Sequence, residues 1–151
     1  MYQFLRRAQH FISFFPRIFG SRRLYKGYIS SLNRCELVEL VNELKQIDCG
    51  SHELTKKYLN WRWYLRENFA RCVSVGLHKS PSVAILDLGS GPGYFLACAQ
   101  YLGNRVIGLD TGDNPIYRSL IKFMQLPPVL IERIERSQKL KTVGDQKFDL
   151  I

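Results

Sequence analysis

The segment from residue 83 to residue 103 constrains the fold more strongly than any other part of the sequence. Residues 83–88 are almost all apolar, which is typical of a short strand buried on both faces of a parallel sheet. The glycine-rich stretch 89–93 follows, and 94–102 then predicts a helix that ends at Gly103. Glycines between a strand and a helix allow positive φ and bring backbone N–H groups close to a ligand. The segment therefore predicts a nucleotide-type site.

The rest of the C-terminal half repeats this alternation. Residues 105–110 predict a second strand, and Asn114-Pro115 begins a helix that runs to about residue 125, before Pro127-Pro128. Residues 129–135 predict a third strand, and 148–151 the beginning of a fourth. We therefore expect an α/β fold with a Rossmann-like, doubly wound parallel sheet of about four strands, incomplete at its C-terminal side.

The spacing of the glycines excludes several nucleotide sites. Gly89 and Gly91 fit the first two glycines of a dinucleotide fingerprint, but the third position is occupied by Tyr94, whose bulk opposes pyrophosphate binding. A P-loop would require a lysine that the segment lacks. A nucleophile elbow would require a residue between Gly89 and Ser90.

An acid two residues before the glycines completes the motif Asp87-Leu88-Gly89-Ser90-Gly91-Pro92-Gly93. This motif resembles the first motif of class I S-adenosylmethionine-dependent methyltransferases, and 83–110 has the strand, loop, helix and acidic strand end of that family in the same order. The resemblance covers about residues 80–151. It implies a methyltransferase that binds S-adenosyl-L-methionine, in a family whose seven strands lie in the order 3-2-1-4-5-7-6.

The resemblance also implies roles for single residues. Asp87 is expected to organise the loop and attract the ammonium group of the cofactor. Asp110, at the end of the second strand, is expected to accept the ribose hydroxyls; the alternative is a turn cap shared with Thr111 and Asp113. Neither a catalytic base nor the methyl acceptor can be assigned, and no metal is expected. The expected cofactor-binding residues are Asp87, Gly89, Ser90, Gly91, Gly93, Tyr94, Asp110 and Thr111.

Residues 36–79 predict a helical extension that precedes the sheet. Asn33 is the expected N-cap of its first helix, with Glu36 completing the cap, and Gly76 the expected end of its second helix, followed by Leu77. Basic side chains alternate with aromatic ones here, so the aromatic rings could stack on nucleic-acid bases. The helical spacing of the aromatic residues favours a role in the core instead. The apolar stripes are Leu37, Leu40, Val41, Leu44 and Ile47 in the first helix, and Leu54, Tyr58, Trp61, Leu65, Phe69 and Cys72 in the second.

The net charge of +9 is concentrated at the N-terminus, because residues 1–35 contain seven Lys or Arg and no acid. This basic arm is consistent with a mitochondrial transit peptide over residues 1–31. It is equally consistent with binding to an anionic membrane surface or to nucleic acid. The fourth alternative is an arm that packs its phenylalanines on its own domain. We expect the arm to be dispensable for cofactor binding.

Cysteine and histidine spacing bears on metal binding and on the redox compartment. Cys35, Cys49, Cys72 and Cys98 form no C-x-x-C pair, and the three histidines stand alone, so we expect reduced thiols in a cytosol-like compartment. No run of eighteen apolar residues is present, so no transmembrane helix is expected.

Two other functions remain open from the sequence. One is an NAD-type oxidoreductase on the same fold, and the other is a non-catalytic module that binds a nucleotide or nucleic acid. Because the sequence stops within the expected fourth strand, we expect the N-terminal part of a methyltransferase that lacks the acceptor-binding half. Such a chain is expected to be poorly soluble and inactive alone.

Overall fold

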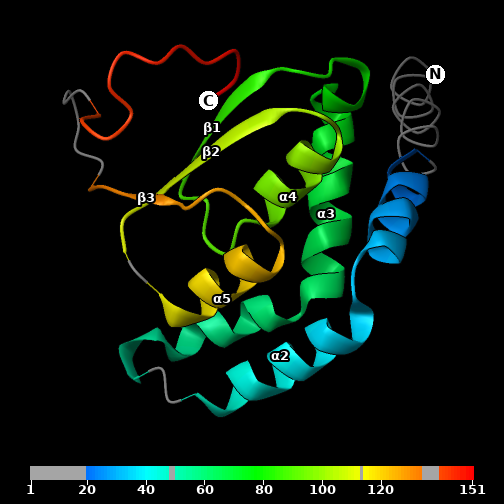
Figure 1. Ribbon diagram of the computed structural model, residues 1–151, viewed down its shortest axis with the longest axis vertical. Coiled ribbons are helices and arrows are strands. Elements are labelled where there is room, and N and C mark those ends of the chain that lie inside the picture. The colour runs from blue at the N-terminus through cyan, green and yellow to red at the C-terminus, as the bar shows by residue number, and fades with distance from the viewer. Residues whose placement is uncertain (1–19, 48–49, 113, 134–139) are drawn as a thin grey trace, which may run out of the picture.

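A computed structural model describes residues 20–47, 50–112, 114–133 and 140–151. Its sheet contains three parallel strands in the order β1-β2-β3 (Figure 1). β1 and β2 pair over five residues, from Ala84 opposite Arg105 to Leu88 opposite Leu109. The chain is therefore an α/β protein with a small parallel sheet, whose strands are β1 (Ala84–Leu88), β2 (Arg105–Asp110) and β3 (Leu130–Ile131).

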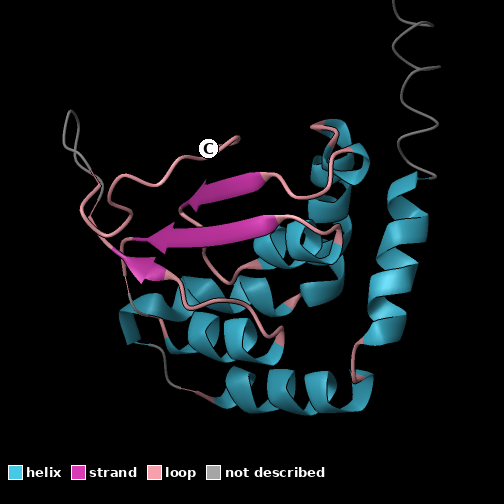
Figure 2. Cartoon of the chain, turned by 45° about the horizontal axis from the view of Figure 1, so that its top comes forward, coloured by secondary structure: helices cyan, strands magenta, loops and turns pink. Residues whose placement is uncertain are grey.

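The two crossover helices are α4 (Tyr94–Tyr101), between β1 and β2, and α5 (Pro115–Phe123), between β2 and β3. Parallel crossovers are almost always right-handed, so strands that step in one direction place their helices on one face. Figure 2 shows the helices on one side of the strands. The other face packs against Val143, with Leu140 and Phe148 beside it. The described residues thus form a sheet with helices on one face, and the doubly wound arrangement is not confirmed.

Residues 148–151 lie beside β1, on the side opposite β2, without forming the expected fourth strand. A single parallel bridge joins Ile85 to Leu150. In a regular ladder the Ala84 N–H would donate to a backbone carbonyl. Here it donates to the Asp149 carboxylate at 2.8 Å. The third strand is also shorter than expected, because β3 ends at Ile131; part of the predicted range 129–135 lies outside the described residues.

The first described residues, 20–31, are helical, and α2 (Arg34–Gln46) follows them. The predicted cap is confirmed: the Asn33 side chain accepts from the Glu36 N–H at 3.3 Å and donates to the Glu36 carboxylate at 3.1 Å. Leu37, Val41 and Leu44 of the predicted stripe are buried. Leu40 and Ile47 are half-buried at its margins.

The predicted second helix is instead two elements, the 3₁₀ helix η1 (Gly50–Leu59) and the α-helix α3 (Trp61–Ser74). A 3₁₀ helix has about three residues per turn, so a stripe spaced for an α-helix does not stay on one face of it. Leu54 was expected in that stripe and is 84% exposed, so this prediction is wrong. The end of the helix is as expected, because Gly76 has φ +83° and Leu77, which begins η2 (Leu77–Lys79), is buried.

The main core lies between the helices and the sheet, and α3 and α4, which lie side by side in Figure 1, pack closely against each other within it. Leu65, Phe69 and Cys72 of α3 are fully buried there, so the aromatic stripe of α3 belongs to the core. The Cys98 thiol of α4 donates to the Leu65 carbonyl at 3.7 Å. Cys72 and Cys98 are free thiols, and burial raises the pKa of Cys72 to about 12. Within the described residues, no helix is long and apolar enough to cross a membrane.

Candidate functional site at the carboxyl ends of β1 and β2

The glycine loop connects β1 to α4 in a conformation that requires its glycines. Gly89, Gly91 and Gly93 have φ of +73°, +52° and +78°, which lies in the left-handed region that other residues rarely adopt. The Gly93 N–H donates to the Ser90 carbonyl at 3.0 Å, and the Gly93 carbonyl accepts from Ala97 in the first turn of α4. The glycine spacing is therefore explained by the backbone path.

Asp110, the last residue of β2, fixes this loop from the neighbouring strand. One carboxylate oxygen accepts from the Gly91 N–H at 2.7 Å, and the other accepts from the Thr111 N–H at 2.7 Å. The sequence left a capping role open for Asp110, and its bond to Thr111 is of that kind. A carboxylate has about four lone-pair sites, so these two bonds leave room for further donors. Asp113 lies outside the described residues.

Asp87, near the end of β1, has a different environment. It is half-buried, and this burial raises the pKa of its carboxyl to about 6. The guanidinium of Arg71 opposes this increase, and the carboxylate of Asp110 adds to it. The loop-organising role expected for Asp87 is carried by Asp110 among the described residues.

Ser90 lies under the loop, against β2. Its hydroxyl is buried and has no hydrogen-bond partner within the described residues. A Cβ on Gly108 of β2 would lie 2.8 Å from that hydroxyl and 2.6 Å from Leu96 Cδ1. Gly108 is thus required for the loop to lie on β2. Gly108 was not predicted as a site residue, although a glycine inside a strand often marks a close approach of the backbone to another group.

A cavity of about 520 Å³ opens beside the loop, with Gly91 and Asp110 on its border. The Tyr117 ring approaches to 3.9 Å of the position of a Cβ on Gly91. The volume is within the usual range for small-molecule sites. The rest of the lining is mostly apolar and was not predicted from the sequence. It comes from α5 and from residues 126–131, which follow α5. The apolar lining residues are Tyr117, Ile121, Leu126, Pro128, Val129 and Ile131, and Asn114, Arg118 and Lys122 also border the cavity.

No protein-family model, curated protein or solved structure matches this chain. The site is therefore interpreted from its own residues. Among the residues that the structure describes, no group of three or more His, Cys, Asp or Glu side chains is placed to hold a metal ion.

Tyr94 and Thr111 were both expected at the site, but neither side chain forms a contact with the glycine loop that the structure records. The Tyr94 ring is buried in the core, stacked on Tyr64 with ring centres 5.6 Å apart, and its hydroxyl donates to the Tyr58 carbonyl at 2.7 Å. The sequence predicted that the bulk of this ring opposes pyrophosphate binding, but the ring points into the core and does not fill the space over the loop. Thr111 is exposed and contributes its backbone N–H to Asp110.

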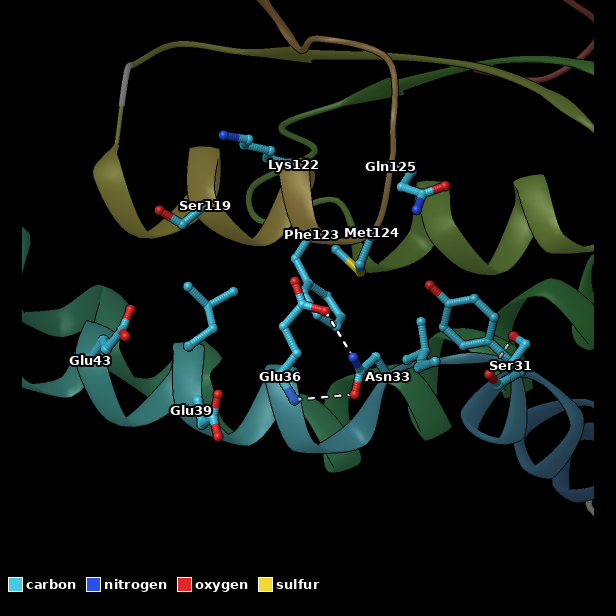
Figure 3. Close-up of a pocket in the computed structure, with 13 residues that line it drawn as sticks. Ser31, Asn33, Glu36, Glu39, Glu43, Ser119, Lys122, Phe123, Met124 and Gln125 are labelled. Atoms are coloured by element: carbon cyan, nitrogen blue, oxygen red, sulfur yellow. Dashed lines mark hydrogen bonds between the residues drawn. The ribbon is translucent and has the colours of Figure 1, made fainter.

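A larger cavity, of about 680 Å³, lies between α2 and the C-terminal end of α5 (Figure 3). Glu36, Glu39 and Glu43 lie along its α2 side, and Lys122 lies on the α5 side. All three glutamates are exposed, which is typical of the solvated face of a surface helix. The glycine loop, with a buried unpartnered hydroxyl and a mostly apolar cavity, is the better candidate for a ligand site.

Proposed function

We propose that the chain binds S-adenosyl-L-methionine at the carboxyl ends of β1 and β2, as part of a methyltransferase. The observation that carries this proposal is the bond from the Gly91 N–H to the Asp110 carboxylate. In a dinucleotide site, the corresponding loop N–H groups bind a pyrophosphate. Here the Asp110 carboxylate already accepts from the Gly91 N–H, so this donor is not available to a phosphate. A ligand with an adenosine but without phosphates therefore suits the loop best.

The residues present fit the adenosine part of this cofactor. Asp110 has unused acceptor capacity beside the cavity, which suits a ribose with two neighbouring hydroxyls. The apolar wall formed by Ile121, Leu126 and Val129 suits a flat aromatic base. The unpartnered Ser90 hydroxyl supports a polar ligand or water close to the loop, because buried polar groups in proteins normally have a partner.

When bound, the cofactor supplies a sulfonium methyl group for transfer. The contribution of the chain is to hold the adenosine with Asp110 and the cavity wall, and to keep the loop in a single conformation. Such positioning accelerates a displacement because the reacting atoms are already aligned. The methyl acceptor is left unassigned.

Isothermal titration calorimetry on the full chain tests the proposal with S-adenosylhomocysteine and NAD as the two ligands. We expect S-adenosylhomocysteine to bind more tightly than NAD. We also expect Asp110→Asn to weaken its binding and Glu39→Gln, on α2, to leave it unchanged. Tighter binding of NAD would refute the proposal and favour an oxidoreductase, and binding of neither ligand would refute a site for adenosine at this loop.

A further inference from the structure

A third cavity, also of about 520 Å³, lies where α2, η1 and the first turn of α3 meet. Its charged lining residues are all cationic, and no acidic side chain is among the described residues that line it. The cations come from three different elements, so the fold brings them together. They are Lys45 of α2, Lys56 and Lys57 of η1, and Arg62 of α3.

Three of these cations have no anion beside them. The Lys45 ammonium donates to the side-chain oxygen of Asn42 at 3.4 Å, and the Lys57 ammonium lies 5.0 Å from the centre of the next residue's ring. The Arg62 guanidinium lies over the Trp61 ring, 4.7 Å from its centre. None of the three forms an ion pair with a described residue. Because like charges at one cavity repel each other, an anion there would be stabilised by all of them.

The beginning of α3 adds to this positive charge. The first turn of α3 contains no acid, and its N-cap, Asn60, makes no capping hydrogen bond with its side chain. The N-terminus of a helix carries a partial positive charge that favours anions. The stacking of Arg62 on Trp61 also holds the guanidinium in place, in the planar form that suits a phosphate. The cavity therefore fits a phosphate group.

An exposed tryptophan lies next to this cationic pocket. Trp63 follows Arg62, and its backbone N–H donates to the Asn60 carbonyl at 3.1 Å, so it belongs to the same first turn of α3. Its side chain is 48% exposed, although tryptophan is highly buried on average. Its ring meets the Tyr64 ring edge to face, with centres 4.7 Å apart. Cations beside an exposed aromatic ring are typical of proteins that bind single-stranded nucleic acid.

We infer that the cationic pocket binds the backbone phosphates of a single-stranded nucleic acid through Lys45, Lys57 and Arg62. A base of the same strand stacks on Trp63. A flexible strand can enter a recess of this kind, whereas a flat bilayer suits cations on a protruding face, so a nucleic acid is favoured over a membrane. The inference does not rest on the proposed function, because neither cavity shares a lining residue with the other.

Fluorescence anisotropy on the full chain tests the inference, with a labelled oligouridylate of about twelve nucleotides as the probe. The main variant combines Lys45→Gln, Lys57→Gln and Arg62→Gln. We expect it to weaken binding at least about tenfold and to reduce the slope of log affinity against log salt by about 2, since each phosphate contact with a single strand contributes about 0.7.

The control variant removes the same charge from exposed positions outside the pocket, by combining Lys79→Gln, Lys141→Gln and Lys147→Gln. We expect it to leave the salt slope nearly unchanged. Trp63→Ala should weaken oligouridylate binding about tenfold at an unchanged salt slope, because stacking is not ionic. A duplex of the same length has its bases already stacked, so it should bind more weakly and be insensitive to Trp63→Ala.

Equal effects of the two triple variants would overturn the inference, because the charge of the whole chain would then account for binding. Unchanged oligouridylate binding by Trp63→Ala would overturn the stacked base and with it the preference for a single strand. Phosphatidylserine vesicles that bind through the pocket, without oligouridylate binding, would make an anionic membrane the partner instead. Thermal unfolding of each variant checks the fold, which we expect to be retained because all the substituted side chains are exposed.

Discussion

The ends of β1 and β2 each carry an aspartate, but the two carboxylates are in opposite situations. Asp110 accepts two backbone N–H donors, each at 2.7 Å, and so completes the loop. Asp87 accepts no hydrogen bond from the described residues, and burial raises the pKa of its carboxyl to about 6. The same side chain on neighbouring strands is thus satisfied by the fold in one place and left unsatisfied in the other.

This difference separates a carboxylate that the fold itself uses, with acceptor capacity left for a ligand, from a carboxylate that the fold leaves without a hydrogen-bond partner. A carboxylate that accepts backbone donors stabilises the folded chain before any ligand arrives. A carboxylate that is desolvated without a partner destabilises the folded chain, and such groups cluster at functional sites. The comparison predicts that removing the two carboxylates changes stability in opposite directions.

The largest change in stability is expected from a substitution that displaces the glycine loop, because the loop joins β1 to α4 and contacts the end of β2. Gly93 has φ +78°, and a Cβ there would lie 2.7 Å from Leu126 Cδ1. We expect Gly93→Val to reduce the free energy of unfolding by about 3 kcal/mol or more, from backbone strain and overpacking. Urea unfolding measures this. Gly112→Ala is the control, because no atom lies within 4 Å of its Cβ position. Equal stability of the two variants would contradict the loop geometry.

Removing the satisfied acid is expected to destabilise the chain. Asp110→Ala leaves the Gly91 and Thr111 N–H groups without their acceptor, and bonds to charged groups contribute about 1.5–3 kcal/mol. We expect Asp110→Ala to lower the free energy of unfolding by about 2 kcal/mol in urea unfolding. Asp110→Asn should have a stability between those of the wild type and Asp110→Ala. Glu67→Ala, which removes an exposed ion pair, should cost less than about 1 kcal/mol. A loss for Asp110→Ala no larger than this control would mean that the carboxylate does not fix the loop.

Removing the unsatisfied acid is expected to stabilise the chain at neutral pH. Because the folded-state pKa of Asp87 is raised from 3.8 to about 6, its carboxyl favours folding below pH 4 and loses this contribution as the pH rises through 6. We expect Asp87→Asn to gain about 1–2 kcal/mol at pH 7.5 and almost nothing at pH 4.

Thermal unfolding across this pH range measures the gain for Asp87→Asn. The charged or titratable groups near Asp87 are the Arg71 guanidinium, the Cys72 thiol and the Asp110 carboxylate. Cys72→Ser controls for the thiol, whose pKa of about 12 keeps it neutral throughout. If Asp87→Asn destabilised the protein at pH 7.5, Asp87 would be a satisfied structural acid like Asp110.

The sequence predicted that these acids lie at one edge of the sheet, because the carboxyl ends of neighbouring parallel strands lie side by side. It could not predict which of them holds the loop. That depends on which face of its strand each side chain occupies and on how far it reaches: Asp87 faces the helices, and Asp110 reaches the Gly91 N–H. Gly108 and Tyr117 were missed for the same reason, since their importance arises from atoms that are distant in sequence.

The boundaries of helices and strands show the same limit. Caps and stops depend on neighbours in sequence, and Asn33, Asn114 and Gly76 were predicted correctly. η1 follows 3₁₀ geometry, which the apolar spacing around Leu54 does not reveal. The Asp149 carboxylate takes the Ala84 N–H that a backbone carbonyl would accept in a regular strand pair. Because Ala84 and Asp149 are far apart in the sequence, no local pattern predicts this competition.

The smallest effect is expected at Tyr94, the first residue of α4, which the sequence placed at the site and the structure places in the core. Its hydroxyl donates to the Tyr58 carbonyl at 2.7 Å, and removing a neutral hydrogen bond costs about 1 kcal/mol. We expect Tyr94→Phe to lose about that much in urea unfolding and to bind S-adenosylhomocysteine as the wild type does. Tyr101→Phe, half-exposed at the other end of α4, is the control for a helix tyrosine. Weaker binding by Tyr94→Phe at unchanged stability would place the Tyr94 hydroxyl in the site, because a core role affects folding first.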